Sequence, residues 1–217
     1  MYPNIPLSSY IDHTLLKADA TEGQIRKLCA EALEQKFYAV CVNGSRVRLA
    51  RQFLGNAPVK IAAVVGFPLG AMETSSKAQE TSGAVGNGAD EIDMVINIGQ
   101  LKDGNTEAVL EDIRAVVRAA AGRPVKAIIE TALLTNEQKV LACKLAVEAG
   151  ATFVKTSTGF GSTGATVEDV KLMRATVGRN IGVKASGGIK DRQMALAMIE
   201  AGATRIGTSS GVAILQS

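Results

Sequence analysis

The chain of 217 residues has a length that suits one large domain. It is 47% apolar and 21% charged, and no apolar run reaches the roughly 20 residues that a membrane span requires. A net charge of +3, without tryptophan and without a run of Lys or Arg, gives no basis for nucleic-acid binding. The N-terminus lacks the basic and apolar regions of a secretory signal, so we expect a cytoplasmic protein.

Short β-rich runs alternate with helical patterns along the chain. The strands are mostly continuous apolar runs, which is typical of a parallel sheet buried on both faces. The predicted strands lie near 10–14, 37–42, 59–65, 90–96, 124–130, 152–155, 181–184 and 204–207. The predicted helices lie near 21–35, 45–54, 74–86, 106–121, 136–148, 166–177, 191–200 and 209–215.

Eight β-then-α units in one chain predict an α/β protein with a (β/α)8 fold, a TIM barrel that forms a single domain over 1–217. A doubly wound open sheet is the alternative. No Gly-x-Gly-x-x-Gly run follows the first strand and no phosphate-binding Gly-x-x-x-x-Gly-Lys run occurs, which weakens that alternative. Three widely spaced cysteines and one histidine argue against a disulfide framework or a zinc site, so we expect no metal.

Two lysines stand where an apolar strand meets a Gly/Ser/Thr-rich turn. Lys155 ends the sixth predicted strand and Lys184 ends the seventh, so both lie at the face of the barrel where chemistry collects. A second cation nearby, or loss of water, frees a lysine amine to attack a carbonyl. The pair therefore predicts a Schiff-base site, with Gly182 leaving open volume below Lys184. The alternative is that one or both lysines extend to solvent.

Carboxylates on buried strands supply the next set of candidates. Asp93 lies within an otherwise apolar strand, where an unpaired acid costs several kcal/mol, so we expect a lysine partner across the barrel. Asp12 is a second inward candidate, on the first strand. The alternative interpretations are an ion pair that only fills the barrel for Asp93 and a loop or cap hydrogen bond for Asp12. Asp93 sits in mid-strand, which can place it deeper than the two lysines.

Glycine-rich turns follow the sixth, seventh and eighth strands, at 156–164, 186–190 and 207–211. Each leads into a predicted helix, whose free N–H groups and positive dipole end attract phosphate. Together with the two lysines, these turns predict a phosphorylated carbonyl substrate. Other polar residues near the strands are weaker candidates, either accessory to the site or structural; they are Cys41, His13, Glu130, Lys126 and Lys60.

The motifs Lys155-Thr-Ser-Thr-Gly159, Lys184-Ala-Ser-Gly-Gly188, Glu91-Ile-Asp-Met-Val95 and Asp12-His-Thr-Leu-Leu16 closely resemble those of the deoxyribose-phosphate aldolase family. The match runs from about residue 8 to 212. This resemblance implies a class I aldolase that cleaves 2-deoxy-D-ribose 5-phosphate reversibly to D-glyceraldehyde 3-phosphate and acetaldehyde, with no metal or other cofactor. It also implies a homodimer or another homo-oligomer.

The resemblance implies a role for each matching residue. Lys155 forms the imine, Lys184 lowers the pKa of Lys155 and helps to move protons, and Asp93 donates or accepts a proton. The residues implied at the substrate are Asp12, Thr14 and Cys41. The residues implied at the phosphate are Gly159, Gly187, Gly188, Gly207, Ser209 and Ser210.

The sequence departs from some relatives at two places. They carry a lysine where this chain has Phe160, and they have a longer tail that ends in a tyrosine, whereas this chain stops at Ser217. Three other functions stay open: a different lysine-dependent sugar-phosphate aldolase or transaldolase, a phosphosugar isomerase or epimerase with Asp93 as base, and a non-catalytic phosphosugar-binding barrel.

Overall fold

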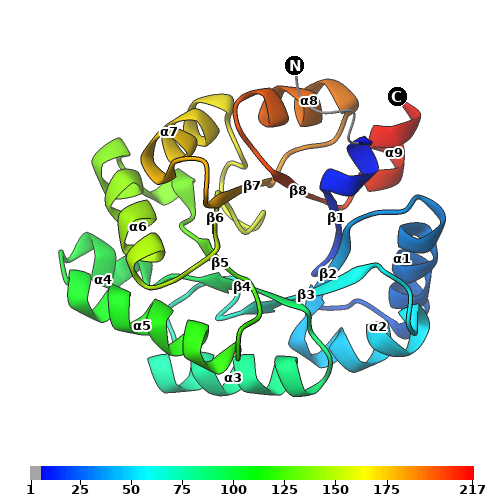
Figure 1. Cartoon of the computed structure of the whole chain (residues 1–217), viewed down its shortest axis with the longest axis horizontal. Coiled ribbons are helices and arrows are strands. Elements are labelled where there is room, and N and C mark those ends of the chain that lie inside the picture. Colours follow the sequence, from blue (N-terminus) through cyan, green and yellow to red (C-terminus); the bar gives the residue numbers. More distant parts are fainter. Residues whose placement is uncertain (1–5) are drawn as a thin grey trace.

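The computed structural model describes residues 6–217, in which parallel strands β1 to β8 follow one another in chain order and close into a barrel (Figure 1). Each strand pairs with the next, and β8 pairs with β1. The predicted (β/α)8 fold is confirmed; residues 1–5 of the predicted domain lie outside the described residues. The strands are β1 (Ile11–Leu15), β2 (Ala39–Asn43), β3 (Lys60–Val65), β4 (Glu91–Val95), β5 (Val125–Ile128), β6 (Phe153–Lys155), β7 (Gly182–Ser186) and β8 (Arg205–Thr208).

Helices surround the barrel, as Figure 1 shows, and eight of them match the predicted helices. These are α1 (Glu22–Glu34), α2 (Val47–Leu54), α3 (Thr74–Gly86), α5 (Thr106–Ala119), α6 (Asn136–Glu148), α7 (Val167–Val177), α8 (Arg192–Glu200) and α9 (Gly211–Gln216). Helix α4 (Ile98–Lys102) was not predicted, because five residues are too few to display a helical period. The same holds for the 3-10 turns Leu7–Tyr10, Gly44–Arg46 and Thr131–Leu133.

Local sequence sets where the longer helices begin. Thr21 accepts a hydrogen bond from the backbone N–H of Gln24, and the Gln24 side chain accepts one from the backbone N–H of Thr21, which is a capping box at the start of α1. Thr135 and Gln138 form the same arrangement at the start of α6. These reciprocal bonds satisfy backbone groups that the first turn leaves free, so the helices start within a residue of their predicted positions.

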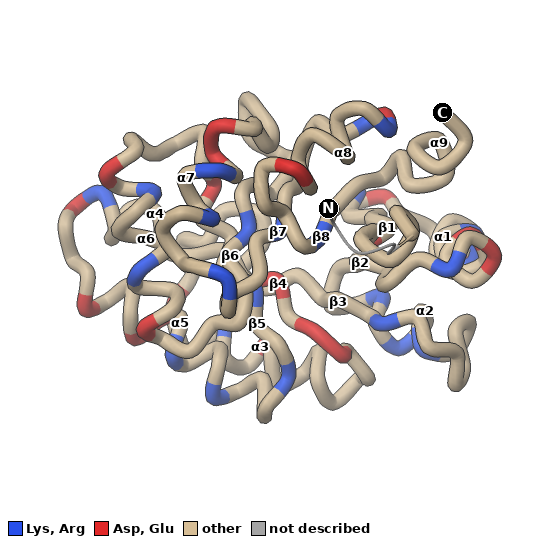
Figure 2. The backbone as a smooth tube through the Cα atoms, turned by 45° about the horizontal axis from the view of Figure 1, so that its top comes forward, with Lys and Arg blue, Asp and Glu red and all other residues tan. Residues whose placement is uncertain are grey.

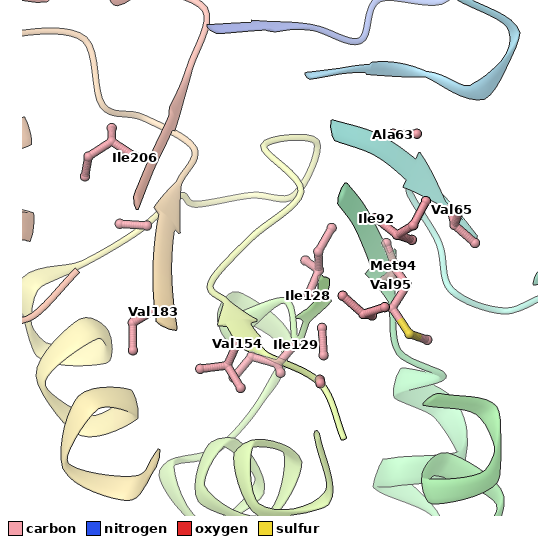
Figure 3. Packing of buried hydrophobic residues seen from close by; sticks show 14 of the residues in the cluster. Ala63, Val65, Ile92, Met94, Val95, Ile128, Ile129, Val154, Val183 and Ile206 are labelled. Carbon is pink, nitrogen blue, oxygen red and sulfur yellow. The ribbon is translucent and has the colours of Figure 1, made fainter. Parts of the chain in front are cut away.

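The main apolar core lies between the barrel and its helices. Alternate residues of each strand point outward, and Figure 3 shows Val154 and Val183 between their strands and the neighbouring helices. Ile92, Met94 and Ile206 belong to the same fully buried cluster. None of the helices within residues 6–217 is long and apolar enough to cross a membrane.

The inside of the barrel has two unlike halves. Near β2 and β3 it is apolar, with a small buried cluster of Leu16, Cys41, Ala62 and Val64. On the other side, buried charged residues project from β4, β5, β6, β7, β8 and β1. Figure 2 shows both signs of charge on central strands as well as on the outer helices. The charged half is the region that contains the predicted site.

Candidate active site

Lys155 and Lys184 are neighbours, as the sequence predicts. They are paired in register between β6 and β7, and parallel partners in register point to the same side of the sheet. Lys184 is fully buried and the Lys155 side chain is 4% exposed. Neither lysine extends to solvent, so the alternative of a solvent-exposed pair is wrong.

Asp93 joins the two lysines. Its Oδ2 accepts hydrogen bonds from Lys155 Nζ at 2.9 Å and from Lys184 Nζ at 2.8 Å. Its Oδ1 accepts a third from Lys126 Nζ at 2.6 Å. The expected lysine partner is therefore present: Lys155 and Lys184 reach Asp93 from β6 and β7, and Lys126 reaches it from the adjacent strand β5. Although Asp93 aligns with Lys126 rather than with Lys155 along the sheet, its carboxylate still reaches both catalytic candidates.

Asp12 extends this network toward β8. Its carboxylate accepts a hydrogen bond from Lys184 Nζ and a second from the Arg205 guanidinium at 3.0 Å. Arg205 also contacts Glu91 at 3.1 Å, and Glu91 contacts Lys126 Nζ at 2.6 Å. Asp12 therefore faces the barrel interior, and the alternative of a capping bond does not hold for it.

The buried network joins four cationic side chains to three carboxylates. Its cations are Lys126, Lys155, Lys184 and Arg205, and its anions are Asp12, Glu91 and Asp93. When all of them are ionised, the network carries one surplus positive charge. A single lysine of the network can therefore lose its proton and leave the remaining charges balanced.

The pKa values of the network members reflect this mutual compensation. Burial by itself raises the pKa of Asp93, but the three surrounding ammonium groups outweigh burial and hold it well below its ordinary value. Burial lowers the pKa of Lys184, but the carboxylates of Asp12 and Asp93 outweigh burial and raise it. Asp93 is therefore a carboxylate at neutral pH, and Lys184 is a cation.

A cavity of about 320 Å³ opens above the network. Lys155 lies in its wall, whereas Lys184, Asp93 and Asp12 lie beneath the wall. Cys41 is buried in the barrel interior and is also absent from the wall. The wall includes every other predicted site residue: Thr14, Gly159, Gly187, Gly188, Gly207, Ser209 and Ser210.

Glycines let the loops of this wall approach one another. Gly159, Gly187 and Gly188 have φ values of 85°, 86° and 78°, in the left-handed region that favours glycine. A Cβ atom on Gly164 would lie 2.1 Å from the carbonyl oxygen of Gly187, so the loops after β6 and β7 pack backbone against backbone. The predicted phosphate residues thereby line the same cavity.

The prediction of open volume beside Gly182 is wrong. A Cβ atom built there would lie 2.1 Å from the Phe153 ring, which fills the space inside the barrel. Phe153 and Gly182 are partners in register, and the missing side chain of one accommodates the ring of the other. The cavity is built instead from the loops above the strands.

Comparison with known proteins identifies the family. The model of the DeoC/LacD family aldolases matches residues 7–217. The chain is 63% identical over 210 residues to a deoxyribose-phosphate aldolase of Bdellovibrio bacteriovorus, covering 97% of this chain and 96% of that protein. The chain belongs to the DeoC/LacD family of aldolases.

Two solved structures extend the similarity to the fold. QR15, an aldolase, superposes with a TM-score of 0.94 at 42% identity and covers 98% of this chain and 95% of its own. The deoxyribose phosphate aldolase of Aeropyrum pernix, described as a tetramer, superposes with a TM-score of 0.91 at 34% identity, covering 97% and 90%. The resemblance drawn from the sequence motifs is therefore confirmed.

For this aldolase, sequence reasoning undervalued the residues deep in the barrel. Lys126 appeared only as a weak candidate, and Arg205 and Glu91 were not singled out, yet all three complete the buried network. The signal that could have found them is the alternation of side chains along each strand. Each of these charged residues lies on a strand position that points to the same side as a predicted site residue, for example Glu91 two positions before Asp93.

The cavity wall also contains two exposed lysines that sequence reasoning passed over, Lys17 after β1 and Lys190 after β7. Phe160, which replaces a lysine of some relatives, lies in the same wall, is 57% exposed and packs edge-to-face on Phe67 with ring centroids 5.3 Å apart. Positive charge therefore enters this wall from the loops after β1 and β7 instead of from position 160.

The helix N-termini differ from the expectation for phosphate binding. The side chains of Thr166 and Asp191 already accept hydrogen bonds from the first turns of α7 and α8. The first turn of α9 has no such side-chain cap, and Ser210, which precedes it, lies in the cavity wall. Within residues 6–217, no group of three or more His, Cys, Asp or Glu side chains is arranged to hold a metal ion.

Proposed function

We propose that the protein catalyses the reversible cleavage of 2-deoxy-D-ribose 5-phosphate to D-glyceraldehyde 3-phosphate and acetaldehyde through a Schiff base on Lys155. One observation carries the choice of this residue. Among the four network cations, Lys155 is the member in the cavity wall, and it contacts one carboxylate, whereas Lys126 and Lys184 each contact two. Loss of the Lys155 proton disrupts the fewest ion pairs of the network, and a substrate in the cavity can reach this amine.

The covalent step follows from that position. The Lys155 amine attacks the C1 aldehyde of the open-chain sugar, and loss of water from the carbinolamine gives a protonated imine. A base removes the proton of the C3 hydroxyl, the C2–C3 bond breaks, and its electron pair moves into the iminium to form an enamine. Glyceraldehyde 3-phosphate leaves, and protonation and hydrolysis of the enamine release acetaldehyde and the free amine.

Asp93 and Lys184 serve this chemistry by moving protons. The Oδ2 atom of Asp93 lies within hydrogen-bond distance of both lysine Nζ atoms, so a proton that leaves Lys155 has an acceptor at 2.9 Å. The raised pKa of Lys184, caused by Asp12 and Asp93, makes it a cation that orients the carboxylate. A water in the cavity beside Lys155 would carry protons between this buried pair and the carbinolamine and enamine carbon.

The phosphate group of the substrate would lie against the opposite part of the cavity wall. That part combines backbone N–H groups of the Gly187 and Gly188 turn, the hydroxyls of Ser209 and Ser210, and the uncapped start of α9. The nearby ammonium groups of Lys17 and Lys190 complement a doubly charged phosphate. Asp12 supports the site through Lys184, and Thr14 lines the cavity.

Borohydride reduction in the presence of acetaldehyde, followed by peptide mass mapping, tests this proposal. We expect a stable two-carbon adduct on Lys155 that is absent from Lys155→Leu, and we expect glyceraldehyde 3-phosphate as the product from deoxyribose 5-phosphate. An adduct on Lys184 would exchange the two roles. Absence of any adduct, with deoxyribose 5-phosphate still bound, would overturn the covalent mechanism and leave an isomerase or a phosphosugar-binding barrel.

Two further expectations stay predictions. Self-association is supported by the Aeropyrum pernix relative, whose structure is described as tetrameric. A cytoplasmic location rests on the sequence alone.

A further inference from the structure

Six of the seven network members form a closed ring of ion pairs. Within it, each side chain contacts two others of opposite charge, so cations and carboxylates alternate. In order around the ring, the members are Arg205, Asp12, Lys184, Asp93, Lys126 and Glu91. Lys155 lies outside this ion-pair ring and joins it through Asp93, at 2.9 Å. When all of these groups are ionised, the ring is neutral and Lys155 carries the surplus charge.

The cations of the ion-pair ring keep their protons. Burial by itself lowers the pKa of Lys126, but its carboxylate partners outweigh burial and raise it. Carboxylates raise the pKa of Lys184 against burial in the same way. Arg205 remains charged as well, because a guanidinium does not lose its proton in proteins. The proton that the network can release is therefore the one on Lys155.

Arg205 and Glu91 close the ion-pair ring at the end of the barrel where the strands begin. Each is the first residue of its strand, β8 and β4, and neither lies in the cavity wall. The central carbon of the Arg205 guanidinium lies 3.4 Å from the centroid of the Tyr38 ring. The Tyr38 hydroxyl donates a hydrogen bond to Glu91 Oε1 at 3.2 Å. Both charged groups are therefore held in place on the side of the network away from the substrate.

We propose that Arg205 and Glu91 are positioning residues that set, through the charge of the ion-pair ring, how readily Lys155 gives up its proton, and thereby the pH range in which its amine attacks an aldehyde. This inference rests on the proposed function. A ring with a net negative charge would hold the Lys155 proton, whereas a ring with a net positive charge would repel it. Arg205 and Glu91 supply one charge of each sign. Together they keep the ring neutral.

Other groups near Lys155 do not supply this balance. Burial raises the pKa of Cys41, on β2, so its thiol is neutral. The ammonium groups of Lys17 and Lys190 are exposed in the cavity wall, where solvent screens them. Glu130, after β5, directs its Oε2 to a backbone N–H of the loop after β6, at 3.1 Å. The buried charges that act on Lys155 are therefore mainly those of the ion-pair ring.

The rate at which acetaldehyde forms the Lys155 imine tests the proposal, because acetaldehyde has no group that titrates. Cyanoborohydride traps the imine, and peptide mass mapping measures the adduct on Lys155. The rate is followed from about pH 5 to 10, a range that includes both lowered and ordinary pKa values of lysines. The midpoint of the rise in rate with pH is the quantity to compare among variants.

Arg205→Met leaves the ion-pair ring one positive charge short. It should move the midpoint up by about 1 pH unit, the order expected for one buried unit charge. The rate below the midpoint should then be about 10-fold lower than in the wild type, and at high pH it should recover to within about 3-fold. Glu91→Gln leaves one positive charge in excess and should move the midpoint down by about 1 pH unit. The double variant has a neutral ring, so its midpoint should return to within about 0.3 pH units of the wild type.

Two variants are the matched controls. Arg205→Lys keeps the charge at the same position. Arg123→Met removes a cation that lies just before β5, outside the ion-pair ring, and donates to the carbonyl oxygen of Ala89 at 2.8 Å. We expect both variants to keep the wild-type midpoint. An equally large shift in Arg123→Met would assign the effect to the net charge of the protein and would overturn the inference.

An unchanged midpoint in Arg205→Met would show that a carboxylate of the ring takes up the proton instead, which also contradicts the proposal. So would a loss of rate at every pH without a change of midpoint, the result expected from a purely structural role. Glu91→Gln preserves the shape of the side chain, so an unshifted midpoint there decides against the proposal even if Arg205→Met does not fold. Absence of an adduct on Lys155 in the wild type overturns the proposed function, and this inference with it.

Discussion

Lys77 and Lys155 are both buried lysines that contact an aspartate, but the charged groups around them differ. Lys77 lies between α3 and α5, where its Nζ donates to Asp112 at 2.6 Å and to the carbonyl oxygen of Val95 at 2.9 Å. Lys155 lies at the cavity and belongs to a network of seven charged side chains. One ammonium faces one carboxylate in the first case, whereas cations outnumber carboxylates in the second.

The pKa directions at the two places are opposite. Burial raises the pKa of Asp112 and lowers that of Lys77, because one partner does not compensate for the lost water. In the network, the opposing charges outweigh burial, so the pKa of Asp93 lies below its ordinary value and that of Lys184 lies above it. A buried lysine is thus not in itself a sign of catalysis. A surplus cation beside a cavity is the distinguishing feature.

The largest expected effect comes from replacing the surplus cation. Lys155→Met should lower kcat by at least about 10³-fold, the scale for loss of a covalent nucleophile, and should abolish the borohydride-trapped adduct. Its thermal midpoint should stay at or above that of the wild type, because three cations then face three carboxylates. Lys184→Met is the comparison, since it leaves the same number of charges but removes a cation that contacts two carboxylates, Asp12 and Asp93, instead of one. A lower midpoint for Lys155→Met than for Lys184→Met would contradict this difference in contacts.

Replacing Lys77, which pairs with Asp112 alone, should lower stability and leave activity nearly unchanged. Lys77→Met leaves Asp112 buried without its cation, which should lower the free energy of unfolding by about 3–5 kcal/mol in denaturant titrations. The folded variant should keep its kcat within about 2-fold, because neither Lys77 nor Asp112 lies in the cavity wall. Adding Asp112→Leu should recover much of the lost stability. A large loss of kcat at full folding would assign Lys77 a place in the site.

The outline of the active barrel was accessible from the sequence because it depends on local patterns. Lys155 ends its strand as predicted, whereas Lys184 lies two residues before the end of β7. The barrel fold still places these strand positions together, so their proximity followed from two independent signals. The glycine turns were found in the same way. What these signals have in common is that each can be read within about ten consecutive residues.

The parts that were missed depend on contacts between distant residues. Arg205 contacts Asp12 across 193 positions of sequence, and Phe153 fills the space that Gly182 leaves on a different strand. Glu130 has a φ of 53°, in the left-handed region. The sequence could not predict this conformation, because glutamate is not a residue that favours positive φ. These contacts depend on which strands are neighbours in the closed barrel and on the volume of individual side chains.

The dependence of stability on pH should distinguish Asp93 from Asp112. The pKa of Asp93 in the folded protein lies well below its ordinary value of 3.8, so the unfolded chain binds its proton first and stability falls as the pH decreases. Asp93→Asn should make this decline shallower between about pH 5 and 3, by up to about 1.4 kcal/mol per pH unit.

Asp112 should act with the opposite sign. Its pKa is raised by burial, so the folded protein binds the proton first, and its contribution to stability is full below the ordinary pKa and is lost as the pH rises through the folded value. Asp112→Asn should therefore steepen the acid decline that Asp93→Asn makes shallower. Unfolding free energies of the two variants and the wild type, measured at each pH, check both signs. Equal slopes for all three proteins would contradict the assigned directions.

The smallest effect concerns a third class of lysine, exposed at the cavity wall. Lys17 and Lys190 have no ion-pair partner within the described residues and lie beside the predicted phosphate loops. Lys17→Met and Lys190→Met should each raise KM for deoxyribose 5-phosphate by about 2- to 5-fold, since solvent screens an exposed charge, and should leave kcat and KM for unphosphorylated deoxyribose unchanged. Raising the ionic strength should reduce the difference between variant and wild type. Because these lysines carry charge without burial, such a result would separate recognition by an exposed cation from the covalent chemistry that we propose for Lys155.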